Sequence, residues 1–431
     1  MKNRALWIIL AVALVLRGGL FVAAACNREG VLTPDSHGYW QLATSMAEQG
    51  RFTRDGKAEI FRTPGYPVFL AALRPVAGWR AVLAAQVLLD VALVALTFVL
   101  GRMLAGPAVG LVAAGLQAVS PLAIAGSCRI LSDGLYALLL TAAVVLLIGG
   151  FRSRRWGPLV IAALVAAAAC YVRPAGLAVV IIMTGVVLFR GGGLARAGVF
   201  AAIAAACLVP WVVRNARVAD YLGFSSFATD SLDRFAAAEI IARRSGRSVD
   251  QVRWQLDNEL DGQALATPGE AARYRSRRAI ETLVSNRALY LRVHLTGSLV
   301  AMLPGATDVL EVAGVTSGQQ GTLAVLHRRG LWPAVAHYFG GSPWAAVVAA
   351  PLVAVWLIRL LGGLICAALK ARWRMSASAW LILLVVCGAI LIGGPASTPR
   401  FRLPIEPLIS VAAALGLALA ARGIRPDQRD G

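Results

Sequence analysis

The sequence predicts an all-α membrane protein that crosses the bilayer many times. Of its 431 residues, 58% are hydrophobic and only 15% are charged, whereas roughly 25% of residues are charged in ordinary globular proteins. The mean hydropathy of +0.70 is too high for a chain that must cover its own surface with polar groups. Apolar runs of about 20 residues can span a bilayer as helices, which pair every backbone group internally. Such runs recur along the chain.

About ten apolar runs are predicted to be transmembrane helices. They cover residues 5–25, 80–104, 107–125, 133–150, 157–171, 175–189, 197–213, 344–366, 378–394 and 405–421. The first run follows Lys2 and Arg4 and ends in Ala23-Ala24-Ala25-Cys26, which resembles a cleavage box. Its length favours a retained helix over a cleaved signal peptide.

Charge asymmetry predicts the orientation of these helices. With a cytoplasmic N-terminus, the short outside loops contain four basic residues, namely Arg129, Arg173, Arg400 and Arg402. The inside loops and tails contain fourteen: Lys2, Arg4, Arg102, Arg152, Arg154, Arg155, Arg190, Arg196, Lys370, Arg372, Arg374, Arg422, Arg425 and Arg429. Positive charge collects on the cytoplasmic side of membrane proteins. The net charge of +20 therefore indicates membrane orientation and not a nucleic-acid surface. We expect a bacterial cytoplasmic (inner) membrane protein with both termini cytoplasmic.

This topology divides the chain into three regions. Residues 1–213 form an N-terminal membrane module whose first outside loop is 26–79, and residues 344–431 form the C-terminal membrane helices. Between them, residues 214–343 are predicted to be an extracytoplasmic or interfacial helical segment. Capping boxes at Ser248–Gln251 and Thr267–Glu270 mark helix starts in it. The apolar stretch 288–303 is predicted to be an interfacial or re-entrant helix.

The first outside loop contains the main catalytic candidate, Asp35. Apolar residues at helical spacing after it, beginning with Tyr39, predict a helix along the membrane surface that Asp35 or Ser36 caps. A carboxylate at a helix N-terminus is kept ionised by the helix dipole. An ionised carboxylate at the water–lipid boundary can act as a general base toward a hydroxyl. The alternative is that Asp35 is only a cap.

The same loop continues with Arg62 and the run Pro64-Gly65-Tyr66-Pro67, followed by a second short apolar helix over 68–73. Two prolines and a glycine restrict the backbone, so Arg62 is held at a defined place. The planar guanidinium group of arginine matches a phosphate. An ordinary surface arginine in a turn is the alternative interpretation.

Arginines in the short outside loops run against the positive-inside trend. Binding of an anionic headgroup or phosphate explains their presence, and Arg173, Arg400 and Arg402 are therefore candidates for phosphate binding. For any one of them, a plain interfacial anchor is the alternative. Asp133, at the start of a helix after Ser132, is a second catalytic candidate or a helix cap.

Two further observations concern cofactors and helix packing. The six cysteines are scattered without a C-x-x-C pair, and the first loop has no Asp-x-Asp pair. We therefore predict no cofactor, and the sequence neither requires nor excludes a divalent metal. Arg17 and Asp90 lie at similar depth inside the first two predicted spans. Because a charge at membrane depth is costly, we predict an ion pair between them.

The order of these motifs resembles the class-C (GT-C) membrane glycosyltransferases, in particular bacterial proteins similar to dolichyl-phosphate-mannose protein mannosyltransferases and aminoarabinose transferase. The resemblance covers nearly the whole chain. It rests on Asp35 and Tyr39, Arg62 with Pro64-Gly65-Tyr66-Pro67, Ser132-Asp133, Arg173-Pro174, Pro210-Trp211 with Arg214-Asn215, Ala279-Ile280 with Asn286 and Tyr290-Leu291, and Arg400-Phe401-Arg402 with Pro404 and Pro407.

The resemblance implies a GT-C-like helical membrane fold with a cavity at the outer leaflet. It implies a polyprenyl-phosphate sugar donor and a lipid, glycan or protein acceptor. Asp35 and Asp133 would match the family's two acids, Arg62 its phosphate-binding residue, and Tyr39 and Tyr66 would line the substrate cavity. Residues 214–343 are too short for the large soluble domain of oligosaccharyltransferases, which leaves the acceptor open.

Two functions from different classes compete. The first is transfer of a sugar from a polyprenyl phosphate to an envelope acceptor. The second is a transporter or flippase for a lipid-linked glycan. Transporters place charged groups near the bilayer midplane and often contain inverted repeats. Here most charged candidates lie at the outer ends of helices, which favours the transferase.

Overall fold

A computed structural model describes residues 2–26, 28–315, 325, 329–339, 343–370 and 376–421. Within these residues the protein is helical apart from one two-stranded antiparallel hairpin, β1 (Thr53–Arg54) and β2 (Lys57–Ala58). The N-terminal module contains α1 (Lys2–Cys26), α2 (Arg28–Val31), α3 (Pro34–Gln49), α4 (Gly65–Ala105), α5 (Pro107–Ala118), α6 (Pro121–Ser127), α7 (Asp133–Ser153), α8 (Trp156–Val172), α9 (Gly176–Val186), the π-helix η1 (Val187–Gly192) and α10 (Gly193–Ala219).

The later elements form two groups. The first comprises α11 (Phe227–Ser231), the π-helix η2 (Leu232–Ala237), α12 (Ala238–Ser245), α13 (Val249–Asp261), α14 (Pro268–Ser285), α15 (Arg287–Val300), α16 (Thr307–Val312) and α18 (Leu331–Tyr338). The second comprises α19 (Pro343–Lys370), α20 (Ala377–Gly393), the 3₁₀ helices η3 (Gly394–Ala396) and η4 (Pro399–Ile405), and α21 (Glu406–Ala421). The chain is a multi-pass membrane protein, as predicted.

All ten predicted apolar runs are helical. Among the described residues, seven helices are long and apolar enough to cross a membrane: Arg4–Cys26, Gly65–Ala105, Asp133–Ser153, Gly193–Ala219, Trp344–Ala368, Ala377–Ala396 and Pro399–Ala421. The pair α5 and α6 is bent by 58° and would make an eighth span if it crosses as one unit. Two shorter apolar helices, Trp156–Val172 and Gly176–Arg190, account for the other predicted runs.

The predicted short helix over 68–73 is the first part of α4. Residues Ala77 and Gly78 break the helical geometry of α4, with Gly78 at a φ of 61°. A positive φ is readily adopted by glycine, so the chain can turn sharply at this point. The break separates the short first part of α4 from the long apolar part that follows.

The buried charges at membrane depth confirm the predicted pair of Arg17 and Asp90. Both side chains are buried, and the Arg17 guanidinium forms an ion pair with Asp90. Arg17 also donates to the backbone carbonyl of Ala118 at 2.7 Å. One arginine therefore links α1, α4 and α5, and each charge inside the bundle has a partner.

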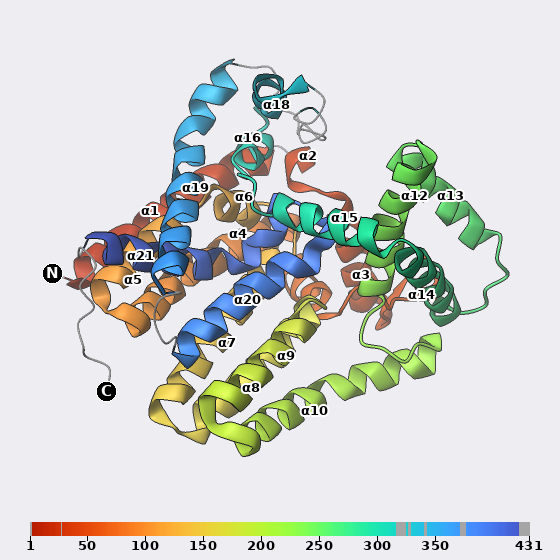
Figure 1. Ribbon diagram of the computed structural model, residues 1–431, viewed down its shortest axis with the longest axis horizontal. Coiled ribbons are helices and arrows are strands. Elements are labelled where there is room, and N and C mark those ends of the chain that lie inside the picture. Colours follow the sequence, from red (N-terminus) through yellow and green to blue (C-terminus); the bar gives the residue numbers. More distant parts are fainter. Residues whose placement is uncertain are drawn as a thin grey trace.

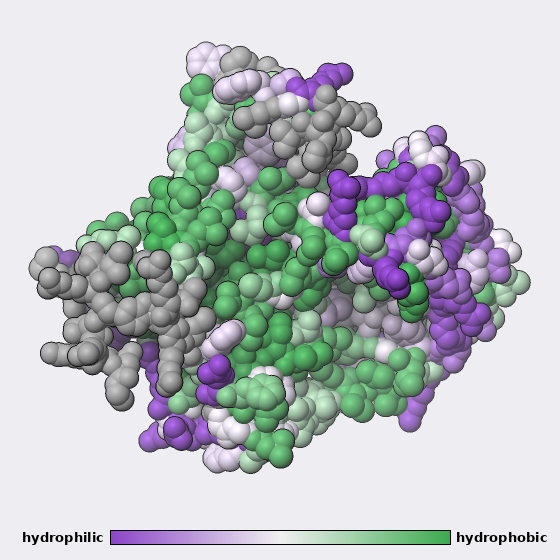
Figure 2. Space-filling view, viewed as in Figure 1, coloured by the Kyte–Doolittle hydropathy of each residue, from purple (hydrophilic) through white to green (hydrophobic). Residues whose placement is uncertain are grey.

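Hydrophilic residues gather on the helices α12, α13 and α14, at the right of Figure 2, whereas apolar residues cover the middle of the same face. The start of α1 lies at the opposite end of the molecule (Figure 1). Both predicted capping boxes, Ser248 with Gln251 and Thr267 with Glu270, are present. Five basic residues used for the orientation, Arg372, Arg374, Arg422, Arg425 and Arg429, lie outside the described residues, and the orientation remains a prediction.

Candidate active site

Thr33 caps the helix α3, which corrects the prediction that Asp35 or Ser36 is the cap. The Thr33 hydroxyl accepts from the backbone N–H of Ser36, and the Ser36 hydroxyl accepts from the backbone N–H of Thr33 at 3.0 Å. Pro34 takes the first helical position, which suits its fixed φ and moves the cap back to Thr33. The Ser36 hydroxyl also donates to the carbonyl of Ile130 at 2.8 Å. The Asp35 carboxylate is therefore free to contact other groups.

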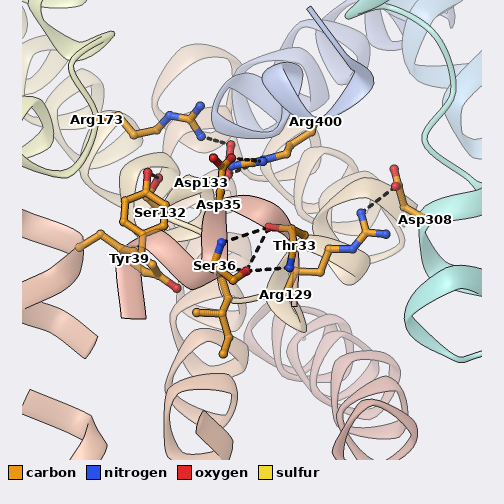
Figure 3. Close-up of polar contacts among 12 residues, drawn as sticks. Thr33, Asp35, Ser36, Tyr39, Arg129, Ser132, Asp133, Arg173, Asp308 and Arg400 are labelled. Atoms are coloured by element: carbon orange, nitrogen blue, oxygen red, sulfur yellow. Dashed lines mark hydrogen bonds and ion pairs between the residues drawn. The ribbon is translucent and has the colours of Figure 1, made fainter. Parts of the chain in front are cut away.

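Two carboxylates and three arginines meet at one end of the bundle, and Figure 3 shows four of these residues, Asp35, Asp133, Arg173 and Arg400. Asp35 accepts from Arg400 Nη1 at 2.7 Å and from Arg62 Nη2 at 3.2 Å. Arg400 also donates through Nε to Asp133 at 2.9 Å. Arg173 forms an ion pair with the other oxygen of Asp133. Residues from α3, α7, η4 and two loops thus converge, although they lie far apart in sequence.

Access distinguishes the two carboxylates. The Asp35 side chain is 43% exposed, whereas Asp133 is completely buried and both of its oxygens accept from arginines. A buried carboxylate whose oxygens are both occupied fixes its partners in place. Asp133 therefore holds Arg173 and Arg400, and of the two acids Asp35 is the exposed one. The catalytic role of Asp133 stays a prediction.

The surroundings favour the ionised form of Asp35. Partial burial raises the pKa of this carboxyl group, but the positive charges of Arg400, Arg62 and Arg173 outweigh the burial, and the resulting pKa lies below the ordinary aspartate value. Opposite charges within a few ångströms stabilise a carboxylate in this way. Asp35 is therefore negatively charged at neutral pH.

The loop before α4 fixes the position of Arg62. The carboxylate of Glu59 is buried and accepts from the backbone N–H groups of Phe61 and Arg62 at 2.6 and 3.1 Å. Gly38 leaves space for the guanidinium group, because a Cβ at that position would lie 2.6 Å from Arg62 Cζ. The Tyr39 ring packs against the same guanidinium, with a distance of 5.0 Å from Cζ to the ring centroid.

The two tyrosines take different places. The Tyr39 hydroxyl lies 3.0 Å from the Ser132 hydroxyl, and Tyr39 lines a cavity with Asp35. Tyr66 is buried beside it, with the two ring centroids 4.9 Å apart, and donates to Gln86 at 2.6 Å. Tyr66 therefore supports Tyr39 from behind, which corrects its predicted place in the cavity wall.

A cavity of about 1270 Å³ opens beside Asp35. Its inner wall includes Asp35, Arg62, Arg173 and Arg400, and its outer wall comes from the hairpin β1–β2, α11, η2 and the connection between α13 and α14. The first outside loop, the 214–343 segment and the C-terminal region all contribute. The cavity thus places the arginine–carboxylate cluster within reach of a ligand.

Arg402 lies in a different cluster, which corrects its predicted role in phosphate binding. Its Nε donates to Glu406 at 2.6 Å, and its Nη1 donates to the carbonyls of Ala301 and Leu303. Glu406 also forms an ion pair with Arg359 and accepts from the Ser120 hydroxyl at 2.6 Å. We call these side chains, Ser120, Arg359, Arg402 and Glu406, the Glu406 cluster. All four are buried, so the cluster is structural.

Arg129 also points away from the acids. It forms ion pairs with Asp308 and Glu311 of α16, the first of which is visible in Figure 3. Its role is to hold α16 against the loop that precedes α7.

Several cavity residues were not anticipated from the sequence. They are Arg54, Lys57, Glu59, Thr63, Phe227, Asp230 and Arg275. For Glu59, the one available signal is an acid three residues before Arg62. Thr63 directly follows Arg62 in the first outside loop, and no feature of the sequence singles it out. The others come from the 214–343 segment and the hairpin, where nothing in the sequence indicates which faces meet the first loop.

The residues present do not fit a bound metal ion. Throughout the described part of the chain, no group of three or more His, Cys, Asp or Glu residues is placed to hold one. The two acids of the site, Asp35 and Asp133, already accept from arginines. A cation would have to displace those guanidinium groups.

No protein-family model and no curated protein matches the sequence. The fold, however, matches solved membrane structures. The oligosaccharyltransferase AglB from Archaeoglobus fulgidus, in complex with an inhibitory peptide and a dolichol-phosphate, superposes with a TM-score of 0.53 at 12% identity over 99% of this chain. The same enzyme in its apo form gives 0.53 at 14% identity. The chain has the GT-C fold.

This chain spans about half the length of AglB, since the match covers 52% of that chain. A similarity to ArnT from Cupriavidus metallidurans bound to undecaprenyl phosphate has a TM-score of 0.45 at 12% identity, covering 96% of this chain and 78% of that one. At 12 to 14% identity, the AglB comparisons show the fold of this chain alone.

Proposed function

We propose that the protein is a glycosyltransferase that moves a sugar from a polyprenyl-phosphate donor to a lipid, glycan or protein acceptor. The reaction would occur at the outer face of the bacterial cytoplasmic membrane. One observation carries the proposal: a half-exposed, ionised Asp35 lies between Arg62 and Arg400 in the wall of a large cavity of a GT-C fold.

The proposed reaction is a direct displacement. The acceptor hydroxyl oxygen attacks the anomeric carbon of the sugar and forms the new glycosidic bond. The bond between that carbon and the donor phosphate oxygen breaks, and its electron pair leaves with the polyprenyl phosphate. Asp35 orients the hydroxyl and accepts its proton as that proton becomes acidic in the transition state. Proton, electron pair and leaving group are then all accounted for.

The arginines supply charge stabilisation where it is needed. The donor phosphate carries one negative charge before the bond breaks and gains another afterwards. Arg62 and Arg400 are held by Asp35 and Asp133 before any substrate binds. Fixed cations that face a developing charge lower the barrier because they need no reorganisation. Arg173 is the third candidate for this role.

Because both acids are occupied by arginines, we further propose that transfer needs no divalent metal and no organic cofactor. The dolichol-phosphate in the AglB structure supports a lipid-linked donor in proteins of this fold. The acceptor is left open, because this chain spans only about half of AglB.

The test is a product analysis. The purified protein, reconstituted in nanodiscs, is incubated with a panel of polyprenyl-phosphate sugars and bacterial envelope extracts. Mass spectrometry should detect a new glycosylated product together with free polyprenyl phosphate, and a chelator should leave the yield unchanged. Movement of the intact lipid-linked sugar across a vesicle membrane without bond cleavage would contradict the proposal and favour a flippase.

A further inference from the structure

Thr63 carries a buried hydroxyl that no protein group satisfies. The residue is 1% exposed, and its Oγ1 has no hydrogen-bond partner among the described residues. Thr63 lines the same cavity as Asp35, Arg62 and Arg400. It directly follows Arg62 in the loop that Glu59 holds.

An unpartnered buried hydroxyl lowers stability, because it gives up its bonds to water without replacement. Valine has nearly the same shape and carries no such penalty. The position also suits valine, since the residue before Pro64 is restricted to extended backbone, which β-branched residues adopt readily. The fold of the ligand-free protein therefore gives no reason for a hydroxyl at this position.

The neighbours of Thr63 define what would satisfy its hydroxyl. The cavity that Thr63 lines is also lined by Arg62, its neighbour in sequence, and by Arg400, and their positive charges favour an anion. A threonine hydroxyl can donate one hydrogen bond, and hydrogen bonds to charged acceptors are the strong ones. In the described part of the chain, one other buried atom without a hydrogen-bond partner belongs to a residue that lines this cavity. It is Arg275 Nε, whose guanidinium already pairs with Asp230.

We propose that the Thr63 hydroxyl donates a hydrogen bond to a phosphate oxygen of the donor, next to Arg62, and so adds a neutral donor to the arginine cluster. This inference rests on the proposed function, because it assigns Thr63 to the donor side of that reaction. It predicts that ligand binding removes the unsatisfied hydroxyl.

The chain offers a matched control. Thr141 in α7 is also completely buried, and its hydroxyl also lacks a partner in the described structure, but it does not line the cavity. Thr63→Val and Thr141→Val remove the same atom from equally buried positions. If an unpartnered hydroxyl has no function, both substitutions leave binding unchanged and leave the melting temperature unchanged or raised.

The experiment measures binding of two probes, a polyprenyl phosphate and inorganic phosphate, to the full chain in nanodiscs by ligand-induced thermal shift. We expect Thr63→Val to raise the Kd for polyprenyl phosphate by roughly tenfold, without lowering the melting temperature of the ligand-free protein. Thr63→Ser should bind like the wild type, and Thr141→Val should change neither Kd. Loss of binding for both probes indicates that the hydroxyl contacts the phosphate itself; loss for the polyprenyl phosphate alone indicates that the lipid-anchored form is needed.

Equal binding by Thr63→Val and the wild type would overturn the inference. So would a wild type that binds neither probe, or weakened binding that Thr63→Ser fails to restore. Failure of the proposed function gives a different pattern: the wild type binds polyprenyl phosphate through Thr63, but no sugar is transferred from any donor of the panel.

Discussion

The protein builds two clusters of arginines around carboxylates, and they differ in access to ligand. In the first, Asp35 is 43% exposed and faces a cavity of about 1270 Å³ together with Arg62 and Arg400. In the second, Glu406 is 1% exposed and is surrounded by Arg359, Arg402 and Ser120. The residue types are the same, but only the first cluster has space for a substrate. The comparison shows that arginine–carboxylate chemistry alone does not identify a site in a membrane protein.

The two clusters are connected through η4, which carries Arg400 near its start and Arg402 in its middle. The buried Glu406 cluster joins η4 to the carbonyls of Ala301 and Leu303 and to α19. A rigid attachment of η4 fixes the backbone from which Arg400 reaches Asp35. The structural cluster thus supports the geometry of the candidate site.

The largest expected effect comes from removing the negative charge of the exposed cluster. Asp35→Asn should lower the rate of sugar transfer by about 10²- to 10⁴-fold while the protein still folds, because the shape is kept. Asp55→Asn is the matched control: Asp55 lines the same cavity, is 74% exposed and does not touch the cluster. Transfer assays should show near wild-type rates for Asp55→Asn. Equal losses for both variants would remove Asp35 from its special role.

Substitution in the buried Glu406 cluster should lower the stability of the protein. Glu406→Gln leaves Arg359 and Arg402 without a charged partner in the bundle, and breaking a buried ion pair in this way costs about 3–5 kcal/mol. Thermal unfolding in detergent should report a markedly lower melting temperature. A variant as stable as the wild type would show that the Glu406 cluster contributes little to folding.

Substituting Arg400 and Arg402 one at a time distinguishes the role of the candidate site from that of the Glu406 cluster. Lysine keeps the charge but loses the planar pair of donors. Arg400→Lys should lower transfer by roughly 10- to 100-fold with a small change in stability, whereas Arg402→Lys should lower the melting temperature and leave the KM for the donor unchanged. The reverse pattern would mean that the donor phosphate approaches Arg402.

The pair of Arg17 and Asp90 is a second buried contact, remote from the cavity. We expect a double-mutant cycle with Arg17→Met and Asp90→Asn to give a coupling energy of about 1–3 kcal/mol in unfolding measurements, because either single change leaves an unpaired charge. Additive losses in that cycle would contradict the pair. Transfer by the protein that remains folded should be unaffected.

The smallest expected effect is the pH dependence. The pKa of Asp35 lies below the ordinary aspartate value, so its ionised form is present throughout the neutral and mildly acidic range. Its contribution to stability should be constant above about pH 4 and be lost only as the pH falls through the lowered pKa. The difference in melting temperature between the wild type and Asp35→Asn should therefore be flat from pH 5 to 8. A difference that disappears near pH 6 would contradict the charge environment described for Asp35.

The sequence predicts the membrane fold, the pairing of Arg17 with Asp90 and the convergence of Asp35, Arg62 and Arg400. These predictions succeed because the length of the apolar runs and the energetic cost of an unpaired charge in a membrane leave few alternative structures. The sequence does not predict the separation of Arg400 from Arg402, because the segment before residue 405 is expected to be a loop, whereas it forms the 3₁₀ helix η4. With about three residues per turn, side chains two positions apart point roughly 120° apart, one into the cavity and one into the core.

The residues that form the outer wall of the cavity also cannot be predicted from the sequence. Hydrogen bonds such as that from the Ser225 hydroxyl to the carbonyl of Phe61, at 2.6 Å, join segments more than 160 residues apart. Neither partner has a pattern that indicates the other. Thr33 illustrates a local version of the problem, since Pro34 moves the cap from the predicted Asp35 back by two residues to Thr33, which leaves the Asp35 carboxylate available to Arg62 and Arg400.

The most direct test of the account is a cryo-EM structure of the protein in nanodiscs with a non-transferable polyprenyl-phosphate sugar analogue. The account predicts density for the phosphate within hydrogen-bonding distance of Arg62 or Arg400, with the anomeric carbon on the side of Asp35 and no ligand near Glu406. A phosphate bound outside this cavity, with Asp35, Arg62 and Arg400 still paired only to one another and to Asp133, would contradict it.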